Sequence, residues 1–156
     1  TTPDSFQFAA DLIKAGADQQ AIIKNLFRTK PLNALKLWGK AMVALVFDQT
    51  PGIAMSCLAP ADFEETVTTA KDVAFVIDEM RENIVGRASA LGLVWQADPG
   101  APVNGYIEWP VADKLEQLKT ALGGVIKTHH LVFQITDQAL ADVRDMVYKQ
   151  MRSLAQ

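Results

Sequence analysis

Residues 88–109 read ASALGLVWQADPGAPVNGYIEW, and this stretch decides the fold. Ala88 to Gln96 is apolar enough to form a central strand of a sheet. Asp98 to Pro102 holds a glycine between two prolines, which favours a hairpin-type connection. Val103 to Trp109 predicts a second strand, which Pro110 ends because proline has no N–H for the ladder. We therefore expect a β-hairpin in this part of the chain.

Helices and further strands are predicted on both sides of the hairpin. Residues 3–47 are expected to form three consecutive helices. The third follows Pro31, and its inward stripe is predicted to consist of Leu35, Trp38, Met42 and Leu45. The other expected elements are a strand at 53–58, helices at 60–65 and 69–84, a helix at 111–122, a strand at 129–135 and a helix from 136. The fold class is α/β: a three-helix N-terminal segment followed by a small mixed β-sheet domain flanked by helices.

Short local signals mark the ends of several elements. Thr69, with Asp72 three residues later, resembles a capping box at the start of a helix. The pair Gly123-Gly124 ends the helix at 111–122. The turn sequence at 48–52 contains a Pro-Gly pair and divides the chain into two expected domains, 1–47 and 48–156. We expect the three N-terminal helices to pack mainly on themselves or on sequence outside this chain.

Composition and charge exclude several classes of protein. Hydrophobic residues make up 49% of the 156 residues and charged residues 21%, which is typical of a globular protein and excludes disorder. The longest apolar run, 41–47, is too short for a membrane span. The single cysteine excludes an internal disulfide and a Cys-rich zinc site. No secretory signal is recognisable, so we expect a cytoplasmic protein.

Charge alone does not identify a partner. Fifteen basic and eighteen acidic residues give a net charge of −3, which argues neither for nor against a polyanionic ligand. Residues 19–47 carry five basic and no acidic side chains. Such a stretch suits either a phosphate-tracking surface or the solvated face of a helix, and both interpretations stay open.

One segment concentrates side chains that could bind a ligand. Residues 122–130 read LGGVIKTHH. Two glycines after a helix let backbone N–H groups approach an anion, and Lys127 adds a positive charge. His129 and His130 would point to opposite faces of a strand, so they are poorly placed to share a metal ion. The alternative is a helix end followed by a strand that is polar at its start.

Three groups of residues stand out in the N-terminal third: Thr1-Thr2-Pro3, residues 9–13 with 16–18, and Leu35 to Ala41. In this order they resemble the end of the catalytic domain in the DHH family of phosphoesterases. Residues 52–54 and 62–66 follow as landmarks of the DHH-associated domain. Leu122-Gly123-Gly124 and the strand 131–135 stand where the family has a Gly-Gly-Gly-Gly-His loop and an apolar strand.

This resemblance implies the C-terminal part of a DHH-type phosphoesterase. Residues 1–47 would close the catalytic domain, and residues 48–156 would form the substrate-binding, DHH-associated domain. The family hydrolyses nucleotides, short oligonucleotides or polyphosphate with a two-metal site, usually manganese. Its metal ligands lie upstream, so this chain would hold no catalytic residue and no metal ligand. The implied partners are an upstream DHH catalytic domain with manganese or magnesium, and a phosphate-containing small molecule or short oligonucleotide; a homodimer is compatible, and no membrane is involved.

The glycine loop is degenerate relative to the family. Val125 and Ile126 replace two glycines, Lys127 stands in the place of the histidine, and the preceding strand, 105–109, has no arginine. The predicted substrate-binding residues are Gly123, Gly124, Lys127, Thr128, His129 and His130. The alternative hypothesis is a diverged, non-catalytic module kept for packing or for binding a partner.

Overall fold

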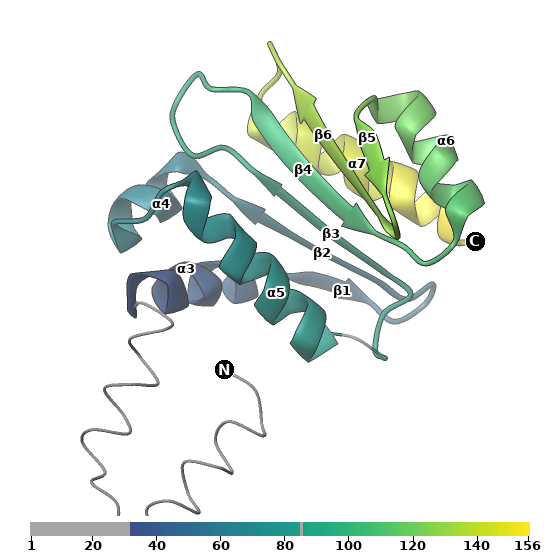
Figure 1. Cartoon of the computed structure of the whole chain (residues 1–156), viewed down its shortest axis with the longest axis horizontal. Coiled ribbons are helices and arrows are strands. Elements are labelled where there is room, and N and C mark those ends of the chain that lie inside the picture. The colour runs from purple at the N-terminus through teal and green to yellow at the C-terminus, as the bar shows by residue number, and fades with distance from the viewer. Residues whose placement is uncertain (1–31, 85) are drawn as a thin grey trace, which may run out of the picture.

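The computed structural model describes residues 32–84 and 86–156, so the first two predicted helices lie outside the described residues. At its centre is a six-stranded sheet in the order β1-β2-β3-β4-β6-β5, with helices on both faces (Figure 1). The strands are β1 (Val46–Asp48), β2 (Ile53–Leu58), β3 (Ala90–Trp95), β4 (Val103–Glu108), β5 (Val125–Lys127) and β6 (His130–Ile135). The helices are α3 (Leu32–Val43), α4 (Pro60–Thr66), α5 (Val73–Ile84), α6 (Ala112–Leu122) and α7 (Leu140–Ala155), with a 3-10 turn η1 (Ala70–Asp72). The mixed sheet flanked by helices confirms the α/β class.

The hairpin predicted from residues 88–109 is present. Strands β3 and β4 pair antiparallel, from Leu91 opposite Glu108 to Trp95 opposite Asn104. The connection between them is closed by Gln96, whose side-chain amide donates to the carbonyl of Ala101 at 2.7 Å. Strand β2 pairs parallel with β3, and the chain between them crosses over through α4 and α5. This gives the sheet its mixed character.

Helices cover the two faces of the sheet unequally. Helices α6 and α7 lie on one face and α3, α4 and α5 on the other (Figure 1). The first core is built from inward side chains of β2, β3, β4 and β6 with α6 and α7, among them Ile107, Trp109, Leu131, Phe133 and Val147. The second is built from β2 and β3 with α3, α4 and α5, among them Leu37, Ala54, Phe63, Val76 and Leu93. Two apolar cores therefore enclose the centre of the sheet.

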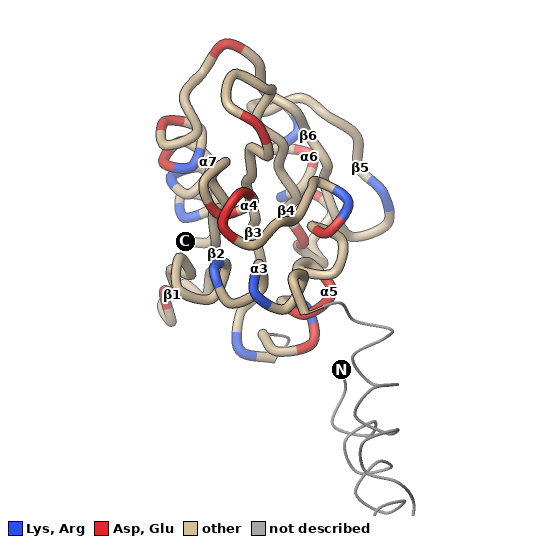
Figure 2. Tube along the Cα trace, turned by 90° about the vertical axis from the view of Figure 1, so that its left-hand side faces the viewer, with Lys and Arg blue, Asp and Glu red and all other residues tan. Residues whose placement is uncertain are grey.

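The outer strands are less covered on the second face. Successive side chains of a strand point to opposite faces, so residues 104, 106 and 108 of β4 lie on this side with 130, 132 and 134 of β6. Val132 of β6 and Val125 of β5 are 38% and 57% exposed. We call this side of the outer strands the open sheet face; it consists of residues 104, 106 and 108 of β4, 125 and 127 of β5, and 130, 132 and 134 of β6. Basic and acidic residues are interspersed over the described part of the chain, with a basic segment on β5 (Figure 2).

Helix α3 differs from its prediction in length and in orientation. The helix was expected to run to residue 47, but it ends at Val43, and Val46–Asp48 pair antiparallel with Ile53–Met55 as β1. A β-branched and an aromatic residue close to a tight turn favour strand pairing, and this tertiary contact overrides the helical periodicity. The expected boundary between residues 47 and 48 thus falls inside a strand.

The buried face of α3 is offset from the predicted stripe. Ala34, Leu37 and Ala41 are buried, whereas Leu35, Trp38 and Leu45 are only partly buried and Met42 is exposed. The two alanines allow the helix to lie close to β2, where the Ser56 hydroxyl donates to the carbonyl of Ala41 at 2.6 Å. Helix α3 therefore packs on the sheet, on α4 and on α5.

Other local signals are found where they were expected. The backbone N–H of Thr69 donates to the Asp72 carboxylate at 2.9 Å, and the Lys71 N–H donates to the Thr69 hydroxyl at 3.3 Å, which confirms the cap before α5. The described residues include no helix that is long and apolar enough to cross a bilayer.

Two glycine substitutions test the packing of the sheet. A Cβ atom at Gly105 in β4 would clash with the ring of Phe133, whereas a Cβ at Gly39 in α3 would meet nothing within 4 Å. We expect Gly105→Ala to lower the free energy of unfolding by about 1–3 kcal/mol through overpacking. Gly39→Ala, the control, should raise it by about 0.5–1 kcal/mol because alanine is the better helix former. Urea unfolding of both variants measures the difference, and equal effects would contradict the Gly105–Phe133 packing.

Candidate functional site

The predicted binding residues lie at the two ends of a short strand that was not predicted. Residues 125–127 form β5, which pairs antiparallel with β6 and places Lys127 opposite His130. Gly123 and Gly124 precede β5, while Thr128 and His129 form the turn that follows it. The six residues are therefore not one cluster. Lys127, Thr128, His129 and His130 lie together at the turn, and the glycines lie at the opposite end of the strand.

The contacts of the glycines serve packing. Gly123 has a φ of +75° and ends α6, and its N–H donates to the carbonyl of Lys119 at 2.7 Å. Gly124 has a φ of +93°, and a Cβ atom there would overlap the carbonyl oxygen of Val132. The pair thus ends the helix and lets β5 lie against β6, as the alternative interpretation of this segment expected. Ligand binding by either glycine stays a prediction.

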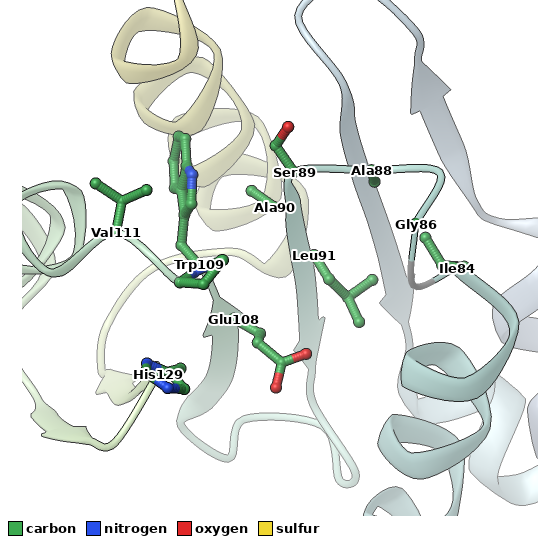
Figure 3. A pocket seen from close by; sticks show the side chains of 11 residues that line it. Ile84, Gly86, Ala88, Ser89, Ala90, Leu91, Glu108, Trp109, Val111 and His129 are labelled. Carbon is green, nitrogen blue, oxygen red and sulfur yellow. The ribbon is translucent and has the colours of Figure 1, made fainter.

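A pocket of about 480 Å³ lies beside the turn. It opens where β3 begins and β4 ends, and the turn supplies His129 (Figure 3). The backbone N–H of Trp109 donates to the carbonyl of His129 at 2.9 Å, which ties the turn to the end of β4. The apolar lining includes Ile84, Leu91 and Val111, and the polar lining includes Ser89, Glu108 and His129. An apolar pocket with a few convergent polar groups is the usual form of a small-molecule site.

Glu108 is the central charged group of this pocket, and the sequence analysis did not identify it. Arg81 on α5 bonds through Nε to Glu108 Oε1 at 2.9 Å, and the Tyr106 hydroxyl donates to the same oxygen at 3.3 Å. The carboxylate side chain is 19% exposed, whereas that of Arg81 is 50% exposed. The alternation of β4 places Tyr106 and Glu108 on one face, but no local signal links them to Arg81.

His130 connects the turn to this ion pair. Its ring stacks on Tyr106 with centroids 4.9 Å apart and an interplanar angle of 27°. Burial lowers the pKa of His130 below its ordinary value, and Arg81 and Lys127 lower it further, while Glu108 opposes them. Burial, followed by the neighbouring Glu108 carboxylate, raises the pKa of Tyr106 to about 12. We call Arg81, Tyr106, Glu108, Lys127 and His130 the polar corner, which combines two basic side chains and one carboxylate with an imidazole whose protonated form is disfavoured.

The described residues do not form a metal centre. Among residues 32–84 and 86–156, no three His, Cys, Asp or Glu side chains gather closely enough to hold an ion. The manganese or magnesium that the resemblance implies therefore does not fit the donor set of this part of the chain.

Cys57 lines a separate pocket of about 100 Å³, and burial raises the pKa of its thiol to about 11. The thiol is therefore protonated at neutral pH and is a poor nucleophile.

Comparison with known proteins finds a shared fold but no sequence relative. No protein-family model and no curated protein matches the chain. An exopolyphosphatase-related protein from Bacteroides fragilis matches with a TM-score of 0.64 at 10% sequence identity, over 99% of this chain and 45% of that one. A pGpG-specific phosphodiesterase from Vibrio cholerae matches with a TM-score of 0.46 at 10% identity, over 88% and 42%, which is too distant to carry an argument.

The chain thus spans less than half the length of either structure that it resembles. At 10% identity, the likeness to the exopolyphosphatase-related protein shows the fold alone.

The titration of His130 tests the electrostatics of the turn. Because the pKa of His130 in the folded protein lies below the ordinary 6.5, the unfolded state binds more protons as the pH falls below 6.5. The contribution of His130 to stability should therefore decrease on acidification through that pH. Lys127→Ala should raise the pKa of His130, and Glu108→Gln should lower it further. NMR titration of the imidazole, assigned with a His129→Asn variant, measures both shifts; Lys149→Ala on α7 is the control and should cause no shift.

Proposed function

We propose that this chain is the substrate-binding part of a phosphoesterase whose catalytic metal ligands are supplied from elsewhere. The observation that carries the proposal is the polar corner: its Glu108 lines a ligand-sized pocket, and the strand register places Lys127, at the β5–β6 turn, two strands away from Glu108. The likeness in fold to part of an exopolyphosphatase-related protein supports it. The expected substrates are nucleotides, short oligonucleotides or polyphosphate, and the expected partner is a DHH-type catalytic domain that holds manganese or magnesium.

The phosphate group would bind at the turn. Lys127 is exposed. In the sheet it lies opposite His130 on β6, and His130 in turn lies opposite Glu108 on β4. Neighbouring strands lie about 5 Å apart, so the row places Lys127 about 10 Å from Glu108 at the backbone. Lys127 and Thr128 thus offer a charge and a hydroxyl to an anion, at a distance from the carboxylate that would repel it.

A packing or partner-binding module is the second candidate function. It is favoured by the glycines, because Gly124 packs against β6 and Val125 replaces a glycine of the loop in the family that the sequence resembles. The exposed valines of the open sheet face also suit a protein contact. The two candidates differ in whether the turn responds to phosphate compounds.

Binding of a nucleoside monophosphate tests the proposed function. We expect this chain alone to bind weakly, near the millimolar range, and a Lys–phosphate contact at an exposed site to contribute about 1 kcal/mol of that binding. Lys127→Ala should weaken binding several-fold and leave the fold intact. Lys149→Ala is a matched control, because Lys149 is an exposed lysine of α7, which covers the other face of the sheet. Amide chemical-shift titration measures both, and an absence of shifts at residues 123–130 would favour the packing module.

Metal titration tests the division of labour. We expect the chain to bind Mn²⁺ or Mg²⁺ no tighter than the roughly millimolar level of scattered surface carboxylates, because the described residues offer no convergent ligand set. Isothermal calorimetry at neutral pH measures this. Stoichiometric binding near micromolar or tighter would contradict the proposal that the catalytic ligands come from elsewhere.

A further inference from the structure

We propose that Glu108 selects the substrate: the pocket beside it takes an uncharged head group that donates hydrogen bonds, so the chain binds nucleoside phosphates in preference to inorganic polyphosphate. This inference rests on the proposed function, which left these substrate classes open. It assigns the phosphate to the turn at Lys127 and the nucleoside to the pocket of about 480 Å³.

The pocket has the size and lining of a site for an uncharged group. Its volume lies within the roughly 300–1,000 Å³ of ordinary ligand pockets. Leu91 and Ile84 form apolar walls, and Figure 3 shows the Glu108 carboxylate between Leu91 and His129. A phosphate chain entering this space would lose its hydration against apolar surface, and the Glu108 carboxylate would offer it no hydrogen-bond donor in return. A nucleobase or a ribose would instead bury apolar area and keep its polar edge for Glu108.

The carboxylate is held in a fixed position for this role. Arg81 and the Tyr106 hydroxyl both contact Oε1 of Glu108, from α5 and from β4. The side chain is thereby oriented, and its second oxygen can accept a hydrogen bond from a ligand without disturbing those two contacts. Ionised carboxylates only accept hydrogen bonds, so the preferred ligand groups are donors, such as the amino group of a base or the hydroxyls of a ribose. Ser89 and His129 add further polar groups to the lining.

The ion pair also keeps Arg81 from acting as a general anion site. The guanidinium is half exposed beside the pocket, but its charge is balanced by Glu108 at 2.9 Å. Removing the charge of Glu108 would release Arg81 toward anions and at the same time weaken the acceptor for the nucleoside. Glu108→Gln should therefore affect the two ligand classes in opposite directions, whereas a merely structural role would weaken both.

The test uses the full chain with four probes: GMP, AMP, ribose 5-phosphate and tripolyphosphate. In wild type, the nucleotides should shift the amide signals of the pocket residues Ser89, Leu91 and Glu108 as well as those of the turn, while tripolyphosphate should shift only the turn. In Glu108→Gln, nucleotide affinity should fall about three- to tenfold, because the amide oxygen of Gln accepts a hydrogen bond without the help of a charge, and tripolyphosphate affinity should rise. The matched control is the double variant Arg81→Gln/Glu108→Gln. Its gain in tripolyphosphate affinity should be smaller than that of Glu108→Gln alone, because the released Arg81 charge is absent. Amide spectra show whether each variant is folded.

The probes also separate the sources of the hydrogen-bond donors. Binding of ribose 5-phosphate as strong as that of the nucleotides would assign the donors to the ribose, and a preference for GMP or AMP would assign them to the base; both outcomes support the inference. Wild-type tripolyphosphate binding that equals nucleotide binding, or that shifts the pocket residues, would overturn it while the proposed function stands. The wild-type comparison decides this even if the variants fail to fold. No shift with any probe would overturn the inference and the proposed function together.

Discussion

The register between β4 and its two neighbours is the constraint on which the rest of the structure depends. Gly105 lies opposite Phe133, and the ring of Phe133 occupies the space that a side chain at 105 would need. With this register, Ile107 and Leu131 enter the core under α6 and α7, while Tyr106 and Glu108 face the other side. A slip of one residue would exchange the two sets and bury the carboxylate of Glu108 among apolar side chains. The packing of one glycine therefore fixes the position of the polar corner.

The polar corner brings together residues of four elements, α5, β4, β5 and β6. Arg81 comes from α5, Glu108 from β4 and His130 from β6, and the aromatic ring of Tyr106 lies under the imidazole. Burial lowers the pKa of His130. The charges of Arg81 and Lys127 lower it further, whereas the charge of Glu108 opposes them. The corner is thus a mixture of signs rather than a basic patch. Such a mixture suits a ligand that has one anionic end and one uncharged end.

The fold and the site support the proposed function in different ways. The likeness to an exopolyphosphatase-related protein concerns architecture, since the sequences share only 10% identity. The site adds the chemistry, because the turn carries the exposed Lys127 and also supplies His129 to a pocket with apolar walls and one oriented carboxylate. The glycine pair, in contrast, is explained by the end of α6 and by the close approach of β5 to β6. Of the residues predicted from the family resemblance, those at the turn are therefore better placed for ligand contact than the glycines.

By itself, the sequence determined those features that depend on local patterns. The hairpin at 88–109, the cap at Thr69 and Asp72, and the helix end at Gly123 follow from turn residues, periodicity and capping chemistry over a few neighbouring positions. The α/β class follows from their order. That Lys127 and His129 lie near each other also follows from the sequence, because they are two residues apart; their role in binding stays a prediction.

Only the tertiary structure decided the features that rest on distant partners. Strands β1 and β5 have three residues each, too few for a periodic signal, and they exist because β2 and β6 pair with them. The buried face of α3 depends on how closely its alanines approach the sheet. The Arg81–Glu108 ion pair joins residues on a helix and a strand that meet only after the sheet has formed. An electrostatic contact depends on distance in space, and for these two residues that distance is set by the packing of α5 on the sheet.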